Sequence, residues 1–159
     1  MSINVLPIFE AYPVFNRISA RLQGCVRSDL RHVRAEDGQE LFRAGDACTE
    51  WCLIVAGKVR VVKPLPTGRT TPLYTVGPGE FCALSVSCLI GDLAYPATAK
   101  AAGEVVGATL PKSVFQKLLD EDATFRREIF GALALRFTVL MGALAETYAV
   151  GEQERVLDS

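Results

Sequence analysis

The sequence predicts a mainly β fold, a jelly roll (double-stranded β-helix), with short N-terminal helices and then a short and a long C-terminal helix. Three observations predict this class. Between residues 29 and 111, about seven or eight short apolar stretches are separated by turns with Gly or Pro, which is typical of a β-sandwich or jelly roll. Strand and helix patterns do not alternate there, which argues against a parallel sheet. After Pro111 the apolar spacing becomes helical.

The N-terminal segment, residues 1–28, carries apolar residues at helical spacing between residues 6 and 22. Pro13 must interrupt this pattern, because proline cannot donate a backbone hydrogen bond inside a helix. We therefore expect two short helices. Gly24 is expected to stop the helical pattern.

The β-roll is expected to occupy residues 29–111. Gly57 is placed at the bend between two strands, and Gly103 between two later strands. Residues 64–71 are polar and are expected to form the tip of a hairpin. The glycines indicate strand boundaries because glycine lets the backbone turn without steric cost.

Residues 112–121 are expected to form a short helix and residues 123–150 a long one, since no proline interrupts the long pattern. The long segment is apolar on several faces and therefore needs more than one neighbour. One face can pack on the β-roll, and a second is expected to meet another copy of the chain. The residues expected in this homodimer interface, at near-heptad spacing, are Ile129, Leu133, Phe137, Leu140 and Leu144.

Length and composition exclude several classes of protein. With 159 residues, half of them apolar, the chain can bury the core of one domain. A net charge of −1 argues against a stand-alone nucleic-acid-binding protein. No uninterrupted run of about 18 apolar residues occurs, and no Lys or Arg precedes Arg17, so neither a membrane span nor a secretory signal is expected. The expected location is the cytoplasm, where the five cysteines would be reduced.

Residues 79–101, which we call the cassette, are the stretch around which the sequence is organised. The cassette follows a Gly-Pro-Gly-Glu turn, continues through small residues with two cysteines, and ends in an alternating strand. Small residues let backbone N–H groups approach a ligand closely. The cassette is therefore the candidate effector site.

Five strings of residues occur in order: RAGD (Arg43–Asp46), LIVAGKVRVV (Leu53–Val62), VGPGEF (Val76–Phe81), ATAKA (Ala97–Ala101) and LPKSVFQKLL (Leu110–Leu119). Together they resemble the effector domain of Crp/Fnr-type bacterial transcription regulators, in the cyclic-nucleotide-binding-domain superfamily, over roughly residues 29–157. The resemblance implies a β-roll that holds an effector, followed by a long dimerisation helix. It also implies that residues 151–159 start the hinge toward a helix-turn-helix domain. That domain is expected to be absent from this chain, which then would not bind DNA by itself.

The cassette departs from that of the family members that bind cyclic nucleotides. Those proteins carry Gly-Glu-Leu, whose Glu takes the ribose hydroxyl, and an Arg that takes the cyclic phosphate. The matching Gly-Glu-Leu positions here hold Ala83, Leu84 and Ser85, and no Arg occurs between Arg69 and Arg126. A phosphate in a partly buried pocket needs a guanidinium partner. We therefore expect no binding of cAMP or cGMP in the usual mode, and the sequence does not identify the effector.

The residues around the two cysteines are similar to those of a Fnr-like subgroup that has a Cys-x5-Cys pair where the nucleotide binders keep their Glu. Lys100 is the one cation of the cassette. The resemblance implies that the effector would contact nine cassette residues: Glu80, Phe81, Cys82, Ala83, Leu84, Ser85, Cys88, Tyr95 and Thr98.

Three interpretations of the cysteines remain open. All five can be buried or incidental thiols, as is usual for reduced cysteine. Alternatively, Cys82 and Cys88 form a reversible redox or persulfide switch, if their Cα atoms approach to disulfide distance and a short helix lowers the pKa of a nearby thiol. A metal site is the third interpretation, but Cys48 and Cys52 lack a second pair of ligands, so no metal is expected.

An enzyme is not expected. His32 is the one histidine, whereas metal-dependent jelly-roll enzymes hold their metal with several histidines. The single histidine also weakens the hypothesis of a haem sensor. Glu80 and Asp92 are the carboxylates near the start and middle of the cassette, too few to argue general acid–base chemistry.

The preferred function is therefore the effector-sensing and dimerisation domain of a Crp/Fnr-family transcription regulator. The alternative is a stand-alone cyclic-nucleotide-binding-like module that acts as a ligand-binding or protein-interaction domain, without DNA binding. Neither function involves a membrane.

Overall fold

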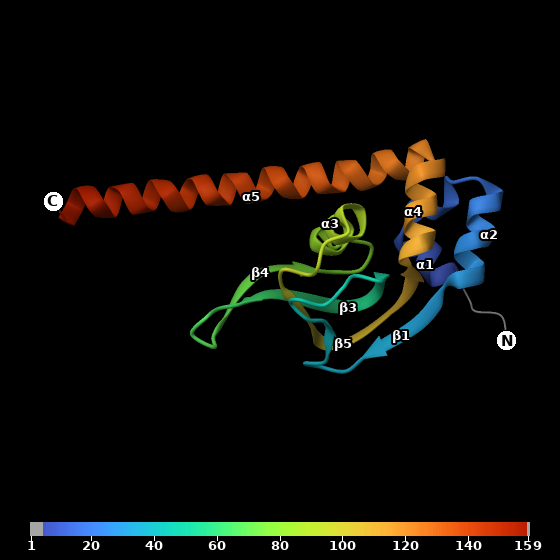
Figure 1. The fold of residues 1–159 in the computed structure, drawn as a ribbon, viewed down its shortest axis with the longest axis horizontal. Coiled ribbons are helices and arrows are strands. Elements are labelled where there is room, and N and C mark those ends of the chain that lie inside the picture. The colour runs from blue at the N-terminus through green and yellow to red at the C-terminus, as the bar shows by residue number, and fades with distance from the viewer. Residues whose placement is uncertain (1–4, 159) are drawn as a thin grey trace.

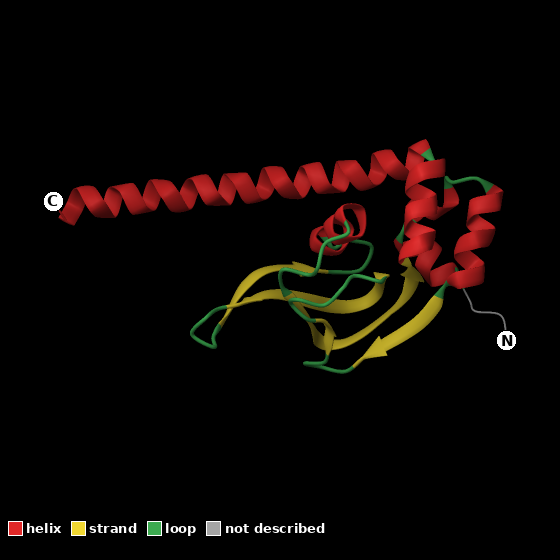
Figure 2. Cartoon of the chain, in the orientation of Figure 1, coloured by secondary structure: helices red, strands yellow, loops and turns green. Residues whose placement is uncertain are grey.

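The computed structural model describes residues 5–158, which form an antiparallel β-roll with helices at one end and one long helix across it. In Figures 1 and 2, α1, α2 and α4 gather at one end of the sheet, and α3 lies between the strands and α5. The elements are α1 (Leu6–Ala11), the 3-10 helix η1 (Pro13–Asn16), α2 (Ala20–Asp29), β1 (Arg31–Ala35), β2 (Glu40–Phe42), β3 (Glu50–Pro64), β4 (Thr70–Val76), α3 (Ala83–Gly91), β5 (Thr98–Pro111), α4 (Lys112–Glu121) and α5 (Ala123–Asp158). This architecture confirms the predicted fold class.

The sheet has the strand order β1-β5-β3-β4, and β2 pairs with β5 beside β1. The two long strands β3 and β5 pair with each other along most of their length and form the centre of the roll. The described residues thus contain five strands rather than the seven or eight expected. The difference arises because β3 and β5 each continue through a glycine that was expected to separate two strands.

Gly57 in β3 and Gly103 in β5 have φ angles of +89° and +78°. The register between the two strands shifts between Ile54 and Lys58, which marks a β-bulge. A bulge bends a strand without ending it. A Cβ atom on Gly57 would lie 2.2 Å from the backbone oxygen of Glu104, so the close approach of the two strands requires glycine there.

The N-terminal segment differs from the expectation in its second helix. Ser19 caps α2, because its hydroxyl accepts the backbone N–H of Leu22 at 3.3 Å. The helix then continues through Gly24 and ends at Asp29. Gly24 is exposed and does not end the helix, because burial of Leu22 and Val26 offsets the low helix propensity of glycine.

Two apolar clusters hold the chain together. The first joins the helices to one end of the β-roll around Trp51, whose ring centroid lies 5.0 Å from that of Phe115 and 5.7 Å from that of Phe125. Val86 and Leu89 of α3 belong to the same cluster. The second fills the inside of the roll and consists of Ala35, Ile54, Val59, Val61, Val76, Cys82, Ala97, Ala99, Ala101 and Val105.

The long helix α5 begins inside the first cluster and ends outside the domain. The carboxylate of Asp122 accepts the backbone N–H of Phe125 at 2.8 Å at its start. Phe125 and Ile129 are fully buried. The helix continues to Asp158 through the residues that were expected to start a hinge. Large apolar side chains are exposed along its later turns: Phe130, Leu135, Phe137, Val139, Leu140, Met141, Leu144, Tyr148, Val150 and Val156.

By length and composition alone, α5 is apolar enough to cross a membrane. One such helix is weak evidence of a membrane span. The geometry opposes a span, because Arg136 of α5 lies over the ring of Tyr74 in β4 and ties this part of the helix to the roll. After Arg136, residues 137–156 carry four charged side chains, Glu146, Glu152, Glu154 and Arg155, whereas a span needs about 20 predominantly apolar residues.

Candidate functional site

The cassette starts in close contact with the N-terminal helices. Gly79 has a φ of +76°, and a Cβ atom on it would lie 2.6 Å from the carbonyl oxygen of Ala11. The hydroxyl of Tyr12 donates to the carbonyl oxygen of Glu80 and accepts the N–H of Ile54, both at 2.9 Å. Burial raises the pKa of this phenol, so it stays protonated and can make both bonds. Tyr12 thereby joins the cassette to β3.

Glu80 and Phe81 follow this contact and have different roles. The carboxylate of Glu80 accepts the N–H of Gly77 at 3.1 Å and closes the turn. The ring of Phe81 packs 5.6 Å from that of Trp51 and 5.3 Å from that of Tyr12. Glu80 therefore fixes the turn at the start of the cassette, and Phe81 anchors the cassette loop in the first cluster.

The N-terminus of α3 is held by a tyrosine of β4. Cys82 is the N-cap residue, and its sulfur lies 3.3 Å from the hydroxyl oxygen of Tyr74. The same oxygen accepts the N–H of Leu84 at 3.1 Å. Burial raises the pKa of Tyr74, so the phenol stays protonated. The guanidinium carbon of Arg136 lies 4.6 Å from the centre of the Tyr74 ring. The side chain of Tyr74 in β4 therefore contacts both α3 and α5.

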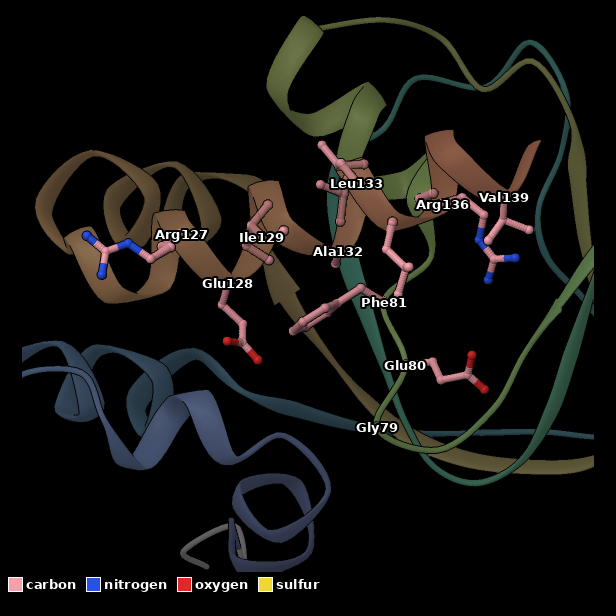
Figure 3. Close-up of a pocket in the computed structure, with 14 residues that line it drawn as sticks. Gly79, Glu80, Phe81, Arg127, Glu128, Ile129, Ala132, Leu133, Arg136 and Val139 are labelled. Carbon is pink, nitrogen blue, oxygen red and sulfur yellow. The ribbon is translucent and has the colours of Figure 1, made fainter. Parts of the chain in front are cut away.

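A cavity of about 540 Å³, which we call the α5 groove, separates the cassette from α5. Its cassette side is formed by Gly79, Glu80, Phe81, Ala83 and Val86, and residues 127–139 of α5 form the other side. Figure 3 shows the ring of Phe81 between the cassette loop and α5, close to Ile129. Any movement of the cassette loop therefore changes the surface against which α5 rests.

A second cavity of about 440 Å³, which we call the β-roll cavity, lies on the strand side of the cassette. Strands β1 to β5 supply most of its lining, which is largely apolar. The cassette contributes Cys82, Ser85 and Tyr95. All three side chains are buried in the folded chain. Six of the nine predicted contact residues thus line two different cavities, three in each.

Tyr95 and Thr98 stabilise the turn of the RAGD string. The thiol of Cys48 donates to the Tyr95 hydroxyl at 2.9 Å, and the Tyr95 ring stacks on Phe42 with a centroid distance of 3.7 Å. The hydroxyl of Thr98 accepts the N–H of Ala44 at 3.1 Å. Leu84 and Cys88, the remaining predicted contacts, pack in the second and the first cluster.

All five cysteines are free thiols. Cys82 and Cys88 stand six positions apart on α3, and six residues of helix rise about 9 Å. A disulfide needs Cα atoms about 4.4–6.8 Å apart, so this pair can be bridged only if α3 unwinds. Burial raises the pKa of the Cys88 thiol to about 11, which disfavours a reactive thiolate at this position.

The cassette supplies no cation to either cavity. Lys100 lines a separate surface hollow with Arg60, away from both cavities. The guanidinium of Arg136 is engaged with the Tyr74 ring. His32 is exposed on β1. Among residues 5–158, no three His, Cys, Asp or Glu side chains are placed to hold a metal ion.

Comparison with known proteins identifies the family. The sequence matches the model of the cyclic nucleotide-binding domain over residues 32–122. No curated protein matches the sequence. Similar solved structures include a chain described as a Crp/Fnr-family transcriptional regulator from Eubacterium rectale (TM-score 0.77, 19% identity, covering 86% of this chain and 63% of that chain). The sensor domain of the transcriptional regulator DNR from Pseudomonas aeruginosa is also similar (TM-score 0.71, 16% identity, 87% and 91%).

The catabolite activator protein of Thermus thermophilus is a third similar structure (TM-score 0.69, 22% identity, 86% of this chain and 63% of that chain). This chain therefore spans a little under two thirds of the length of the Eubacterium and Thermus proteins. At these identities the likeness shows the fold. Because the family match covers more than half of the sequence and includes most of the β-roll, the chain belongs to the cyclic nucleotide-binding domain family.

Proposed function

We propose that this chain is the effector-sensing and dimerisation part of a Crp/Fnr-type transcription regulator in the cytoplasm, without catalytic activity. The observation that carries the proposal is the connection between the cassette and α5. Val86 and Leu89 of α3 pack in the same cluster as Phe125 and Ile129 of α5. A change at the cassette would therefore alter the position of the helix that leads out of the domain.

The exposed face of α5 supports a homodimer. Phe137, Leu140 and Leu144 are 66%, 47% and 47% exposed, whereas Ile129 is fully buried in the domain's own core and Leu133 packs against that core. The two earlier residues of the predicted interface thus serve the fold, and the surface open to a partner starts after them. Burial of these side chains by a second copy would remove them from water, and that burial is favourable at about 25 cal/mol per Å².

The chemistry of the cassette supports an effector other than a cyclic nucleotide bound in the usual mode. Leu84 stands where the resemblance places a ribose-binding Glu, and it packs against the second cluster. A calorimetric titration with cAMP and with cGMP should show no saturable binding at micromolar concentrations. Binding of either nucleotide in that range would contradict this part of the proposal.

The dimer is tested by sedimentation velocity on Leu140→Glu, which places a charge on the exposed apolar face. We expect the wild type to sediment as a dimer and the variant as a monomer, because an unpaired charge in an apolar interface is destabilising. Thr138→Glu is the matched control, since Thr138 is exposed on roughly the opposite side of the helix, at about 100° per residue. A monomeric wild type would favour a stand-alone ligand-binding module.

The same variants distinguish a protein partner from a lipid surface. If α5 inserted into a bilayer, the wild type would float with phosphatidylcholine vesicles and Leu140→Glu would not. We expect the wild type not to float, because the apolar face of its α5 is covered by the second copy. Flotation of the wild type would overturn the cytoplasmic location.

A further inference from the structure

We propose that the β-roll cavity binds an uncharged, largely apolar small molecule and that this molecule is the effector. The inference rests on the proposed sensing function and names the chemical class of the ligand. It differs from the activity that the family name implies, because a cyclic nucleotide is an anion.

The size and the lining of the cavity favour such a ligand. Its volume of about 440 Å³ lies within the range of about 300–1,000 Å³ that is usual for small-molecule sites. Leu41, Phe42, Ile54, Val59, Val76 and Val105 contribute apolar walls. The cavity opens at a rim of exposed residues and reaches the buried side chains of Ile54, Val59 and Val76. A small molecule can therefore enter from solvent and bury apolar surface inside the roll.

The polar groups inside the cavity are neutral. Ser85 is 1% exposed and Tyr95 is 7% exposed, and the hydroxyls of both can donate or accept a hydrogen bond. Burial raises the pKa of Tyr95 far above the physiological range and that of Cys52 to about 11, so neither carries a charge near pH 7. These groups can orient a ligand but cannot compensate an ionic one.

The charged residues that line the cavity disfavour an anion. Three of them are acidic, Glu40, Asp46 and Glu50, and one is basic, Arg34, and all four are exposed at its rim. Arg34 lies 3.9 Å from the carboxylate of Glu104, and Glu40 pairs with Arg43, so both are partly neutralised. Asp46 and Glu50 leave the rim with an excess of negative charge. Moving an anion past a rim with excess negative charge, into a site without a buried cation, is unfavourable.

Two fluorescent probes with the same aromatic rings test the proposal on the full chain. N-phenyl-1-naphthylamine is neutral, and 1-anilinonaphthalene-8-sulfonate carries one negative charge. We expect the neutral probe to bind with one site per chain, at least about tenfold more tightly than the sulfonate. Equal or tighter binding of the sulfonate, or no saturable binding of the neutral probe, would overturn the proposal.

Two variants locate the probe. Val33→Phe places a ring at a half-buried position of the cavity lining and should weaken binding of the neutral probe at least about tenfold. Val150→Glu removes apolar surface from an exposed position of α5 outside the proposed dimer interface and should leave binding unchanged. The opposite pattern would show that the probe sits on α5 and would refute the proposal. Thermal unfolding of each variant verifies that it is folded.

Alkylation by N-ethylmaleimide, followed by mass spectrometry, gives a readout that does not depend on the variants. Cys52 lines the cavity, whereas Cys25 lies in α2 away from it. A saturating concentration of the neutral probe should slow the alkylation of Cys52 at least about threefold relative to that of Cys25. An unchanged ratio would contradict the proposal. The neutral probe could fail to bind although the wild type is a dimer and Leu140→Glu is a monomer. That combination would refute the ligand class and leave the proposed sensing function standing.

Discussion

The guanidinium carbon of Arg136 lies 4.6 Å from the centre of the Tyr74 ring and connects α5 to the strand that holds the N-terminus of α3. Arginine over an aromatic face contributes about 0.5–2 kcal/mol, depending on burial. Both side chains are partly buried. The pair therefore couples the position of α5 to the cassette.

Arg136→Gln should lower the free energy of unfolding by about 0.5–2 kcal/mol, because glutamine retains most of the length but loses the charge. Urea denaturation followed by circular dichroism measures this change. Arg127→Gln is the matched control, since Arg127 is an exposed arginine on the same helix. An equal loss in both variants would show that the Tyr74 contact contributes nothing specific.

Tyr74→Phe should have a larger effect than Arg136→Gln. The hydroxyl of Tyr74 accepts the N–H of Leu84 and contacts the thiol of Cys82, and loss of a partner for partly buried polar groups costs about 1–3 kcal/mol. The same denaturation experiment measures the loss. Tyr148→Phe removes an exposed hydroxyl from α5 and should change the stability by less than about 0.5 kcal/mol.

The sequence predicts the fold class well because it depends on local patterns. Short apolar stretches separated by turns between residues 29 and 111, and helical spacing after Pro111, are properties of neighbouring residues, and the structure confirms the β-roll and the two helices that follow it. The number of strands was overestimated because a glycine can either end a strand or form a bulge inside one, and the sequence does not distinguish these two roles for Gly57 and Gly103. Both have positive φ, yet each lies inside a continuous strand rather than at its end.

The site was predicted only in part, because its key contacts join residues far apart in the chain. The cassette could be located from its glycines and small residues. Tyr12, Tyr74 and Arg136, which hold the cassette to α1, β4 and α5, were missed, since no local pattern reveals a contact between distant elements. The place of Tyr74 in an alternating strand was the only signal, and it does not identify a partner.

Gly79→Ala tests the contact between the cassette and the N-terminal helices. The new Cβ atom would lie 2.6 Å from the carbonyl oxygen of Ala11, and its positive φ would be strained. Gly103→Ala is the matched control, because Gly103 has nearly the same φ but no atom within 4 Å of the new Cβ. Strain costs about 1–2 kcal/mol in both, and overpacking adds about 1–3 kcal/mol in Gly79→Ala alone. Chemical denaturation of both variants should show this difference, and equal losses would contradict it.

The dependence of stability on pH tests whether the thiols of Cys52 and Cys88 are buried in solution. Burial raises the pKa of each from 9.0 to about 11. The folded state therefore holds these protons more tightly than the unfolded state, so this stabilisation is complete below pH 9 and is lost as pH rises toward 11. Between pH 9 and 10, each thiol should lower the free energy of unfolding by about 1 kcal/mol.

Urea denaturation at pH 8, 9 and 10 measures how the free energy of unfolding changes with pH. The slope is compared among the wild type, Cys52→Ala, Cys88→Ala and the double variant. The window ends at pH 10 because the tyrosines of the unfolded chain ionise near that value. Each single variant should lose about half of the slope that the two thiols contribute, and the double variant should lose both halves, whatever its absolute stability. A slope that does not change in any variant would mean that water reaches both thiols. The β-roll cavity would then be more open at Cys52, which lines it, than the raised pKa of this thiol indicates.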